Sequence, residues 1–259
     1  MKRVISMCAV LVALLAGSSA SALTIYDIQY STGPDYNSPY LGQTVDVAGG
    51  VIVKIFAGGS TKITIQDPTL GDAWAGVQVV FSDPSQADGL LAGDRIDLSG
   101  VRVDEYRGNT QLAFLTTSTL IVRSSGNHVE PLVVSVADIP SPTNADLSEP
   151  FEFMLLRVVG VTVGAMDLGK NADNYELGNS EGVCWASDYA NSDLPPGSDY
   201  FVQAGQVFQS VTGYLEQYKR PDQGWDYYQL LPRDAGDYEV FVPVPTETST
   251  WGGVKGMFR

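Results

Sequence analysis

Histidine and cysteine are almost missing from this sequence, and basic residues are scarce. Its 259 residues include one histidine and two cysteines, which excludes a metal site rich in these two residue types. Only 15 Lys and Arg stand against 30 Asp and Glu, so the formal net charge is −15. This strongly negative charge argues against non-specific binding of nucleic acid, because that binding places Lys and Arg against the phosphates.

Features that could support catalysis are few. Gly49-Gly50 and Gly58-Gly59-Ser60 lack the Lys-Ser/Thr pair and the helix that follow in a phosphate-binding loop. Nucleophilic chemistry that needs a histidine could rest only on His128, which lies in the turn-like segment Ser124–His128. We interpret His128 as a surface-loop residue and expect that the chain is not an enzyme.

The N-terminus has the features of a secretory signal peptide. Lys2 and Arg3 form a positive region, Val4–Ala16 is apolar, and Ala20-Ser21-Ala22 fits the small-x-small cleavage pattern before Leu23. The apolar run is shorter than the roughly 20 residues of a membrane-spanning helix. We therefore predict an exported protein, periplasmic, extracellular or on the cell surface, with no transmembrane span in the mature chain. The alternative is a retained membrane anchor.

Cleavage at this site would leave Cys184 as the only cysteine. An exported chain with one cysteine has no internal disulfide, so its stability must come from packing. We expect Cys184, between Val183 and Trp185, to be a small buried apolar residue.

The mature chain has the pattern of an all-β protein, with short β-branched and aromatic runs separated by Gly, Pro, Asn and Asp. Strands are expected in the first half near Val45–Phe56, Lys62–Gln66, Gly76–Phe81, Arg95–Val103 and Gln111–Val122. In the second half they are expected near Phe153–Val163, Asn174–Leu177, Gly182–Ala186, Gln206–Leu215 and Tyr227–Leu231, with a last strand in Asp237–Phe241.

The two halves align with each other, which indicates an internal duplication. Val47–Val53 matches Leu156–Val163, and Gly76–Val79 matches Gly182–Trp185. Each copy has five strands, and the long first strand carries a central glycine where a barrel strand can bend. Closure into a small barrel leaves no exposed sheet edge. We predict two tandem five-stranded OB-like barrels, with a two-sheet sandwich as the alternative.

The predicted domain boundaries follow from this duplication. They are a signal peptide at 1–22, a first OB-like domain at 23–123, a Pro-containing linker at 124–150, a second OB-like domain at 151–241, and a C-terminal spacer and tail at 242–259.

Several segments also resemble a known family. In the first copy they are Tyr26–Gln29, Ile65–Asp67, Val103–Tyr106 and Thr110–Leu112; further along the chain they are Leu132–Val134, Asp138–Pro140, Asp146-Leu147, Phe151–Leu156, Tyr175–Gly178 and Glu181–Val183. They resemble the non-catalytic OB-fold region of secreted bacterial nucleases of the exonuclease/endonuclease/phosphatase type. Phe151–Leu156 is similar to that family's DLE-x-YEGMLV stretch, although Phe153 replaces the glycine. The resemblance implies the fold and export. It does not imply catalysis, which in that family belongs to a separate C-terminal domain.

Aromatic and basic residues cluster around the last hairpin of the second copy, where OB folds often bind ligands. The candidate ligand-binding residues are Tyr218, Lys219, Arg220, Trp225 and Tyr227. Rings flanked by cations suit a single-stranded nucleic acid, and the rings would equally suit a sugar. The alternative interpretation is that these aromatic residues are structural.

Acidic and amide side chains in the loop of the second copy give a candidate calcium site at Asp167, Asn171 and Asp173, because calcium takes oxygen ligands. The spacing does not fit the twelve-residue calcium loop, since its last position would be Gly178. A solvated acidic loop without a cofactor is the alternative.

The C-terminal tail follows a Pro-rich spacer. Trp251, Val254 and Phe258 could share one face of a short helix and dock to a partner. The alternative is a frayed end.

Together these features predict an exported, non-enzymatic binding or adaptor module whose partner is a glycan, a protein or a single-stranded nucleic acid. The alternatives are an accessory nucleic-acid-binding subunit for a separate secreted nuclease, and a structural cell-surface protein.

Overall fold

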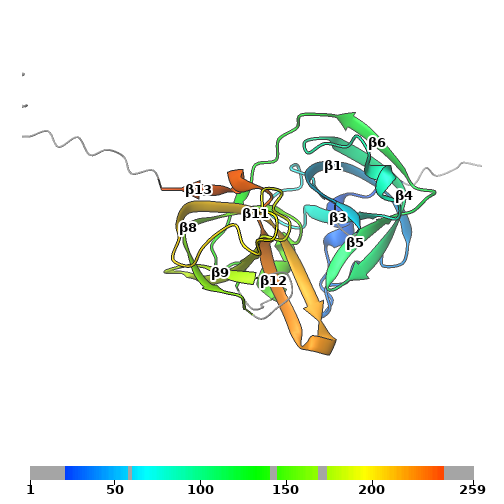
Figure 1. Cartoon of the computed structure of the whole chain (residues 1–259). Coiled ribbons are helices and arrows are strands. Elements are labelled where there is room, and N and C mark those ends of the chain that lie inside the picture. The colour runs from blue at the N-terminus through cyan, green and yellow to red at the C-terminus, as the bar shows by residue number, and fades with distance from the viewer. Residues whose placement is uncertain (1–20, 58–59, 141–144, 169–173, 242–259) are drawn as a thin grey trace, which may run out of the picture.

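Two β-barrels make up the part of the chain that the structure, a computed structural model, describes: residues 21–57, 60–140, 145–168 and 174–241 (Figure 1). The first barrel lies on the right of Figure 1, in blue to green, and the second lies on the left, in green to orange. Within these residues, no helix has the length and apolar character needed to cross a membrane.

The first barrel is a six-stranded sheet preceded by a short helix. Its elements are α1 (Ile25–Gln29), β1 (Thr44–Ala57), β2 (Thr61–Gln66), β3 (Gly76–Phe81), the 3-10 turn η1 (Pro84–Ala87), β4 (Arg95–Tyr106), β5 (Asn109–Phe114) and β6 (Thr119–Ser124). The strand order is β1-β2-β3-β5-β4, and β4 pairs with β1 to close the barrel. Strands β3 and β5 are parallel, and the other pairs are antiparallel.

The second barrel repeats this path. Its elements are β7 (Leu132–Val133), α2 (Ala145–Ser148), η2 (Glu149–Phe151), β8 (Leu155–Met166), β9 (Asn174–Asn179), β10 (Gly182–Ser187), β11 (Val207–Arg220), η3 (Pro221–Gln223), β12 (Trp225–Leu231), η4 (Ala235–Asp237) and β13 (Tyr238–Val240). The order β8-β9-β10-β12-β11 closes through the β11–β8 pairing, and β10 and β12 are parallel. The prediction of two five-stranded OB-like barrels is confirmed, and the sandwich alternative is wrong.

The central glycines of β1 allow one strand to serve two neighbours. The register to β4 shifts between Val47 and Gly50, and Gly49 takes a φ of 90°, a backbone conformation that favours glycine. A Cβ on Gly50 would lie 2.7 Å from the Ile65 side chain. The strand therefore bends here and turns from β4 toward β2.

The predicted strand Gln111–Val122 is wrong in one respect, because a turn divides it into β5 and β6. The Leu115 amide donates to Ser118 Oγ at 2.9 Å, and Ser118 Oγ donates to the Gly100 carbonyl at 2.7 Å. Strand β6 then pairs with the first half of β4. No Gly or Pro marks this turn, so the β-favouring sequence conceals it. Helix α1 was also missed; a Thr24–Asp27 capping box begins it.

The two cores differ in composition. The first contains aliphatic side chains with Phe81 and Phe114, whereas the second also buries Tyr175, Tyr228 and Tyr238. Cys184 lies in the second core with 1% of its surface exposed, as expected. Burial raises the pKa of its thiol to about 12, so the thiol is protonated at neutral pH.

Part of the segment predicted as a linker belongs to the second sheet. Strand β7 pairs in parallel with β8, Leu132 opposite Leu156, and Val134 and Val136 are buried in the second core. The predicted domain boundaries themselves stay a prediction.

The two barrels pack in direct contact through their backbones. A Cβ on Gly76 of β3 would lie 2.3 Å from the carbonyl carbon and oxygen of Phe153. Nearby, the Leu155 amide donates to Gln66 Oε1 at 2.8 Å. The buried Gln29 side chain donates both to the Gly76 carbonyl, at 2.6 Å, and to Glu152 Oε2, at 3.1 Å. These contacts hold the barrels in one fixed arrangement.

Candidate ligand pocket between the barrels

The tip of the β4–β5 hairpin brings the first barrel to the site. Its two-residue turn is Arg107-Gly108, with φ angles of 61° and 91°, the positive values that a type I′ hairpin turn requires. A Cβ on Gly108 would lie 2.2 Å from Gln217 Oε1, so any larger residue here would displace the Gln217 side chain. Arg107 is a rare non-glycine residue at positive φ, a strain that persists only where surrounding contacts hold it.

Those contacts come from β11 of the second barrel. The Lys219 amide donates to the Arg107 carbonyl at 2.6 Å. The Asn109 side chain donates to the Gln217 carbonyl at 2.7 Å and accepts from the Gln217 amide at 3.0 Å. The hairpin tip thus binds the free edge of β11 as another strand would, which fixes the position of Arg107 against the second barrel.

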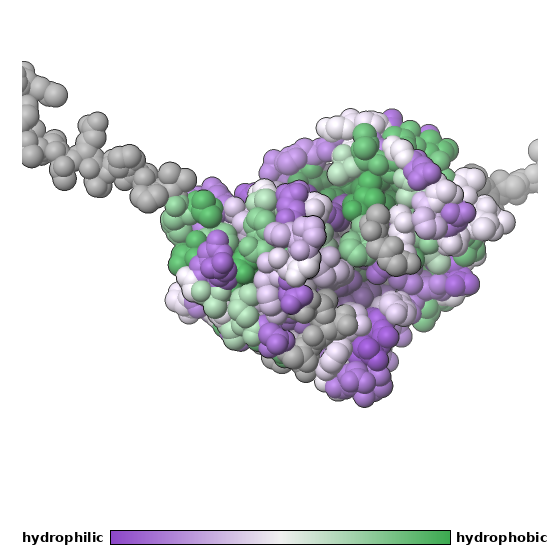
Figure 2. All heavy atoms as spheres, viewed as in Figure 1, coloured by the Kyte–Doolittle hydropathy of each residue, from purple (hydrophilic) through white to green (hydrophobic). Residues whose placement is uncertain are grey.

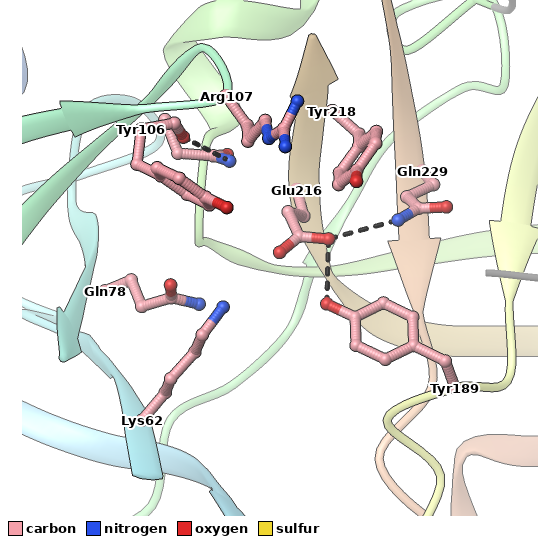
Figure 3. A pocket seen from close by; sticks show the side chains of 9 residues that line it. Lys62, Gln78, Tyr106, Arg107, Tyr189, Glu216, Tyr218 and Gln229 are labelled. Atoms are coloured by element: carbon pink, nitrogen blue, oxygen red, sulfur yellow. Dashed lines mark hydrogen bonds between the residues drawn. The ribbon is translucent and has the colours of Figure 1, made fainter. Parts of the chain in front are cut away.

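A pocket of about 260 Å³ opens beside this junction (Figure 3). Its lining comes from both barrels: Lys62, Gln78, Tyr106, Arg107 and Asn109 from the first, and Tyr189, Glu216, Tyr218 and Gln229 from the second. Neither barrel forms this pocket alone.

One wall is a row of three planar side chains. The Arg107 guanidinium carbon lies 5.4 Å from the Tyr106 ring centroid and 5.8 Å from that of Tyr218, within range for cation–π contact with both rings. Tyr106 is 53% exposed, and its hydrogen bond with Arg107 lowers the pKa of its hydroxyl. The row offers planar surface and positive charge to a ligand.

The floor is polar. Glu216, only 4% exposed, accepts at Oε2 from the Tyr189 hydroxyl at 2.8 Å and from Gln229 Nε2 at 3.0 Å. Burial raises the pKa of Glu216, and the nearby Lys62 ammonium opposes that shift. The other carboxylate oxygen points across the pocket toward Gln78 and Lys62 (Figure 3).

The predicted ligand-binding residues lie on the β11–β12 hairpin, but not all on one face. Tyr218 pairs with Tyr227, and Arg220 with Trp225. These four share the face that continues from Glu216, because side chains alternate along a strand. Lys219 is on the other face, where its ammonium lies 3.8 Å from Asp226.

Burial separates these aromatic residues further. Tyr227 is fully buried, its ring centroid 5.7 Å from that of Tyr218 and 5.2 Å from that of Trp185. Trp225 is half-buried, with the Arg220 guanidinium carbon 5.7 Å from its centroid. Tyr218 therefore reaches the pocket, and Trp225 and Arg220 lie toward the hairpin tip. Tyr227 is a buried residue that packs against the Tyr218 ring.

The structure does not test the predicted calcium site or the predicted docking residues of the C-terminal tail. Asp167 is exposed, while Asn171, Asp173, Trp251, Val254 and Phe258 lie outside the described residues. Among the residues that are described, no three His, Cys, Asp or Glu side chains group as metal ligands. Calcium binding and tail docking stay predictions.

Two local sequences raise the question of nucleophilic chemistry. The pentapeptide Gly178–Gly182 has Gly-x-Ser-x-Gly spacing, but it forms the turn between the antiparallel strands β9 and β10. A nucleophile elbow requires a strand-to-helix turn. His128 is exposed, with Nε2 3.1 Å from a Glu130 oxygen.

Sequence reasoning missed most of the pocket. Lys62, Gln78, Tyr106 and Arg107 had no distinguishing pattern in the sequence. The signal that could have found Glu216 is strand alternation, which places it on the same face as Tyr218.

Comparisons with known proteins give distant likenesses in structure. No family model matches the sequence, and no curated protein matches it. An OB domain from Methanosarcina mazei is 17% identical over 35% of this chain and 81% of its own, with a TM-score of 0.29. Fission yeast Pot1, solved with single-stranded DNA, is 12% identical over 93% of this chain and 94% of its own, with a TM-score of 0.32. Tetrameric p202 HIN2 is 15% identical over 74% and 90%, with a TM-score of 0.37. Such low identities and TM-scores do not bear on what this chain binds.

Proposed function

We propose that this chain is a non-enzymatic binding module for single-stranded nucleic acid, and that the pocket between its barrels takes one nucleotide unit of the strand. The observation that carries the proposal is the Tyr106–Arg107–Tyr218 row above a buried polar floor. Aromatic rings with arginine beside them form the stacking surface that proteins use for unpaired bases.

The local charge favours an anionic ligand over a neutral sugar. Acidic residues outnumber basic ones two to one, yet Lys62 and Arg107 line the pocket. Arg220 continues the same face of the hairpin, where it is paired with Asp222 at 2.8 Å. A neutral sugar would use the rings and the carboxylate but would have no need of these cations. Phosphates would use them.

The hairpin face gives the strand a path away from the pocket. Arg220 and Trp225 continue the face that begins with Glu216 and Tyr218. The β11–β12 hairpin projects at the bottom of Figure 1, and the corresponding region of Figure 2 is strongly hydrophilic. A neighbouring nucleotide could therefore lie on Trp225 with its phosphate near Arg220.

A fluorescence anisotropy titration of the purified chain with a short labelled single-stranded DNA tests the proposal. Tyr218→Ala should weaken binding by about 1–3 kcal/mol, the value of one lost stacking ring. Tyr26→Ala is the matched control: Tyr26 stacks on Tyr30 with centroids 5.1 Å apart, outside the pocket lining. The control should leave affinity unchanged.

Salt dependence distinguishes the ligand classes. Binding of single strands should weaken as salt rises, with a slope of about −0.7 per phosphate contact, whereas binding of a neutral oligosaccharide should hardly change. Glycan binding without oligonucleotide binding, or equal affinity of the Tyr218→Ala variant, would overturn the proposal.

The proposal retains export through residues 1–22. Mature protein recovered outside the cytoplasm should begin at Leu23, which N-terminal sequencing checks. In its more specific form, the proposal is that this chain is an accessory subunit of a separate secreted nuclease. Co-purification of nuclease activity that the chain alone lacks would support it.

A further inference from the structure

The floor of the pocket has three polar groups that face the same space. Glu216 Oε1 accepts no hydrogen bond from the described residues, whereas Oε2 accepts two. The Gln78 side chain, on a residue only 4% exposed, likewise makes no hydrogen bond within the described part of the chain, and it extends toward the same opening beside Lys62 (Figure 3). Neither group is among the polar atoms of the described residues that lack both water and a partner, so both open onto the pocket, where a ligand can take the place of water on them.

We propose that this floor reads the edge of the bound base and selects bases that carry an exocyclic amino group over thymine and uracil. This inference rests on the proposed function, because it assigns base selectivity to the same pocket.

The hydrogen-bonding capacity of the three groups gives the selection its direction. An ionised carboxylate only accepts and an ammonium only donates, while an amide does both. An amino group of cytosine, adenine or guanine can donate to Glu216 Oε1. In cytosine and adenine the ring nitrogen beside the amino group is an acceptor, which can then receive a hydrogen bond from Lys62 or Gln78.

Thymine and uracil present the opposite pattern. Their single ring N–H lies between two carbonyl oxygens, so any pairing of that N–H with Glu216 brings a carbonyl close to the buried carboxylate. Acceptor against acceptor leaves both groups without a hydrogen-bond partner, which is the arrangement that proteins use to reject a ligand.

Glu216→Gln tests this inference, because it should reverse the base preference. Tyr189 and Gln229 both donate to the Oε2 position, so the oxygen of the introduced amide belongs there and its NH₂ group faces the pocket. The change replaces an acceptor by a donor at constant shape. The preference should then move from amino-bearing bases toward thymine.

The measurement compares oligo-dC, oligo-dA and oligo-dT of equal length in the anisotropy assay at about pH 8, well above the ordinary pKa of a glutamate carboxyl. The unaltered chain should prefer oligo-dC and oligo-dA over oligo-dT by about tenfold, within the range of a well-formed base contact. Glu216→Gln should abolish or reverse this ratio. Glu239→Gln, at an exposed position on β13, should keep it.

Each outcome is decisive. If no oligonucleotide binds, the proposed function fails. If all three bind equally, or if Glu216→Gln keeps the wild-type ratio, nucleic-acid binding stands and base selection by this floor is wrong. If Glu216→Gln does not fold, as thermal melting would show, Gln78→Met replaces it. That change should reduce the ratio, and an unchanged ratio would overturn the inference.

Discussion

The two barrels follow the same strand path around different interiors. The first core is built of Ile, Val and Leu with two phenylalanines. The second buries tyrosines against carboxylates: Asp188 accepts from Tyr175 at 3.2 Å, from the Tyr238 hydroxyl and from the Phe201 amide at 2.7 Å. Strand periodicity and a few glycines suffice to set the topology, so the chemistry of the interior can diverge. The pocket takes its buried carboxylate from the polar barrel.

The strongest test of this comparison is the point where the barrels touch. Gly76→Ala should destabilise the protein by about 3 kcal/mol or more, because the new Cβ meets backbone atoms that cannot rotate away. Urea unfolding measures the loss. Gly33→Ala is the control, since its Cβ would have Ser31 Oγ at 3.5 Å as nearest neighbour. Equal stability of the two variants would show that the barrels do not pack as described.

The second test uses pH, to which the carboxylates of the second barrel should respond. Burial raises the pKa of Glu149 to about 7, and the buried Tyr228 hydroxyl donates to it. Because the folded pKa is raised, the stabilisation is complete below the unfolded value near 4.5 and is lost as pH rises toward about 7. The loss should reach about 3 kcal/mol.

Chemical denaturation at about pH 4.5 and about pH 8 measures this difference. Glu149→Gln should reduce the pH dependence but not remove it, because burial also raises the pKa of Glu152. Glu239→Gln, exposed on β13, should keep it in full. A pH dependence that is identical in both variants would mean that other groups cause it.

The third test removes one buried hydroxyl. Tyr238→Phe takes a donor from Asp188, whose pKa burial already raises. Leaving a buried acceptor short of its partner should cost about 1–3 kcal/mol of unfolding free energy. A cost near zero in thermal melting would show that water replaces the hydroxyl and that this core is less dry than its contacts indicate.

The smallest effect is expected in the aliphatic barrel. Ile63→Val removes one methylene from a residue that is 1% exposed and should cost about 1 kcal/mol. Because Ile63 lies in a cluster of apolar side chains, the cost should be the same at low and high pH. A pH-dependent cost would contradict the division between an apolar and a polar barrel.

How far the sequence predicts this molecule depends on the range of the interactions involved. The barrels were predictable because duplication repeats a local pattern, and Gly49-Gly50 marks the bend in β1. The division of Gln111–Val122 was not, because Ser118 ends β5 through its own side chain. The pocket was hidden since it joins Lys62 and Gln78 to Glu216 across the two copies. The exposure of the predicted aromatics also depended on such distant neighbours, since Trp185 covers Tyr227.

The contacts between the barrels have a consequence for the order in which the chain is made. Gln66 and Asn109 belong to the first barrel, but their hydrogen-bond partners, Leu155 and Gln217, come much later in the sequence. During N-to-C synthesis or translocation the polar side chains on this face of the first barrel therefore hydrogen-bond only to water until the second barrel is made. A nascent chain that stops before Gln217 should keep the Asn109 side of this face exposed, and the second barrel should complete a surface that the first barrel began.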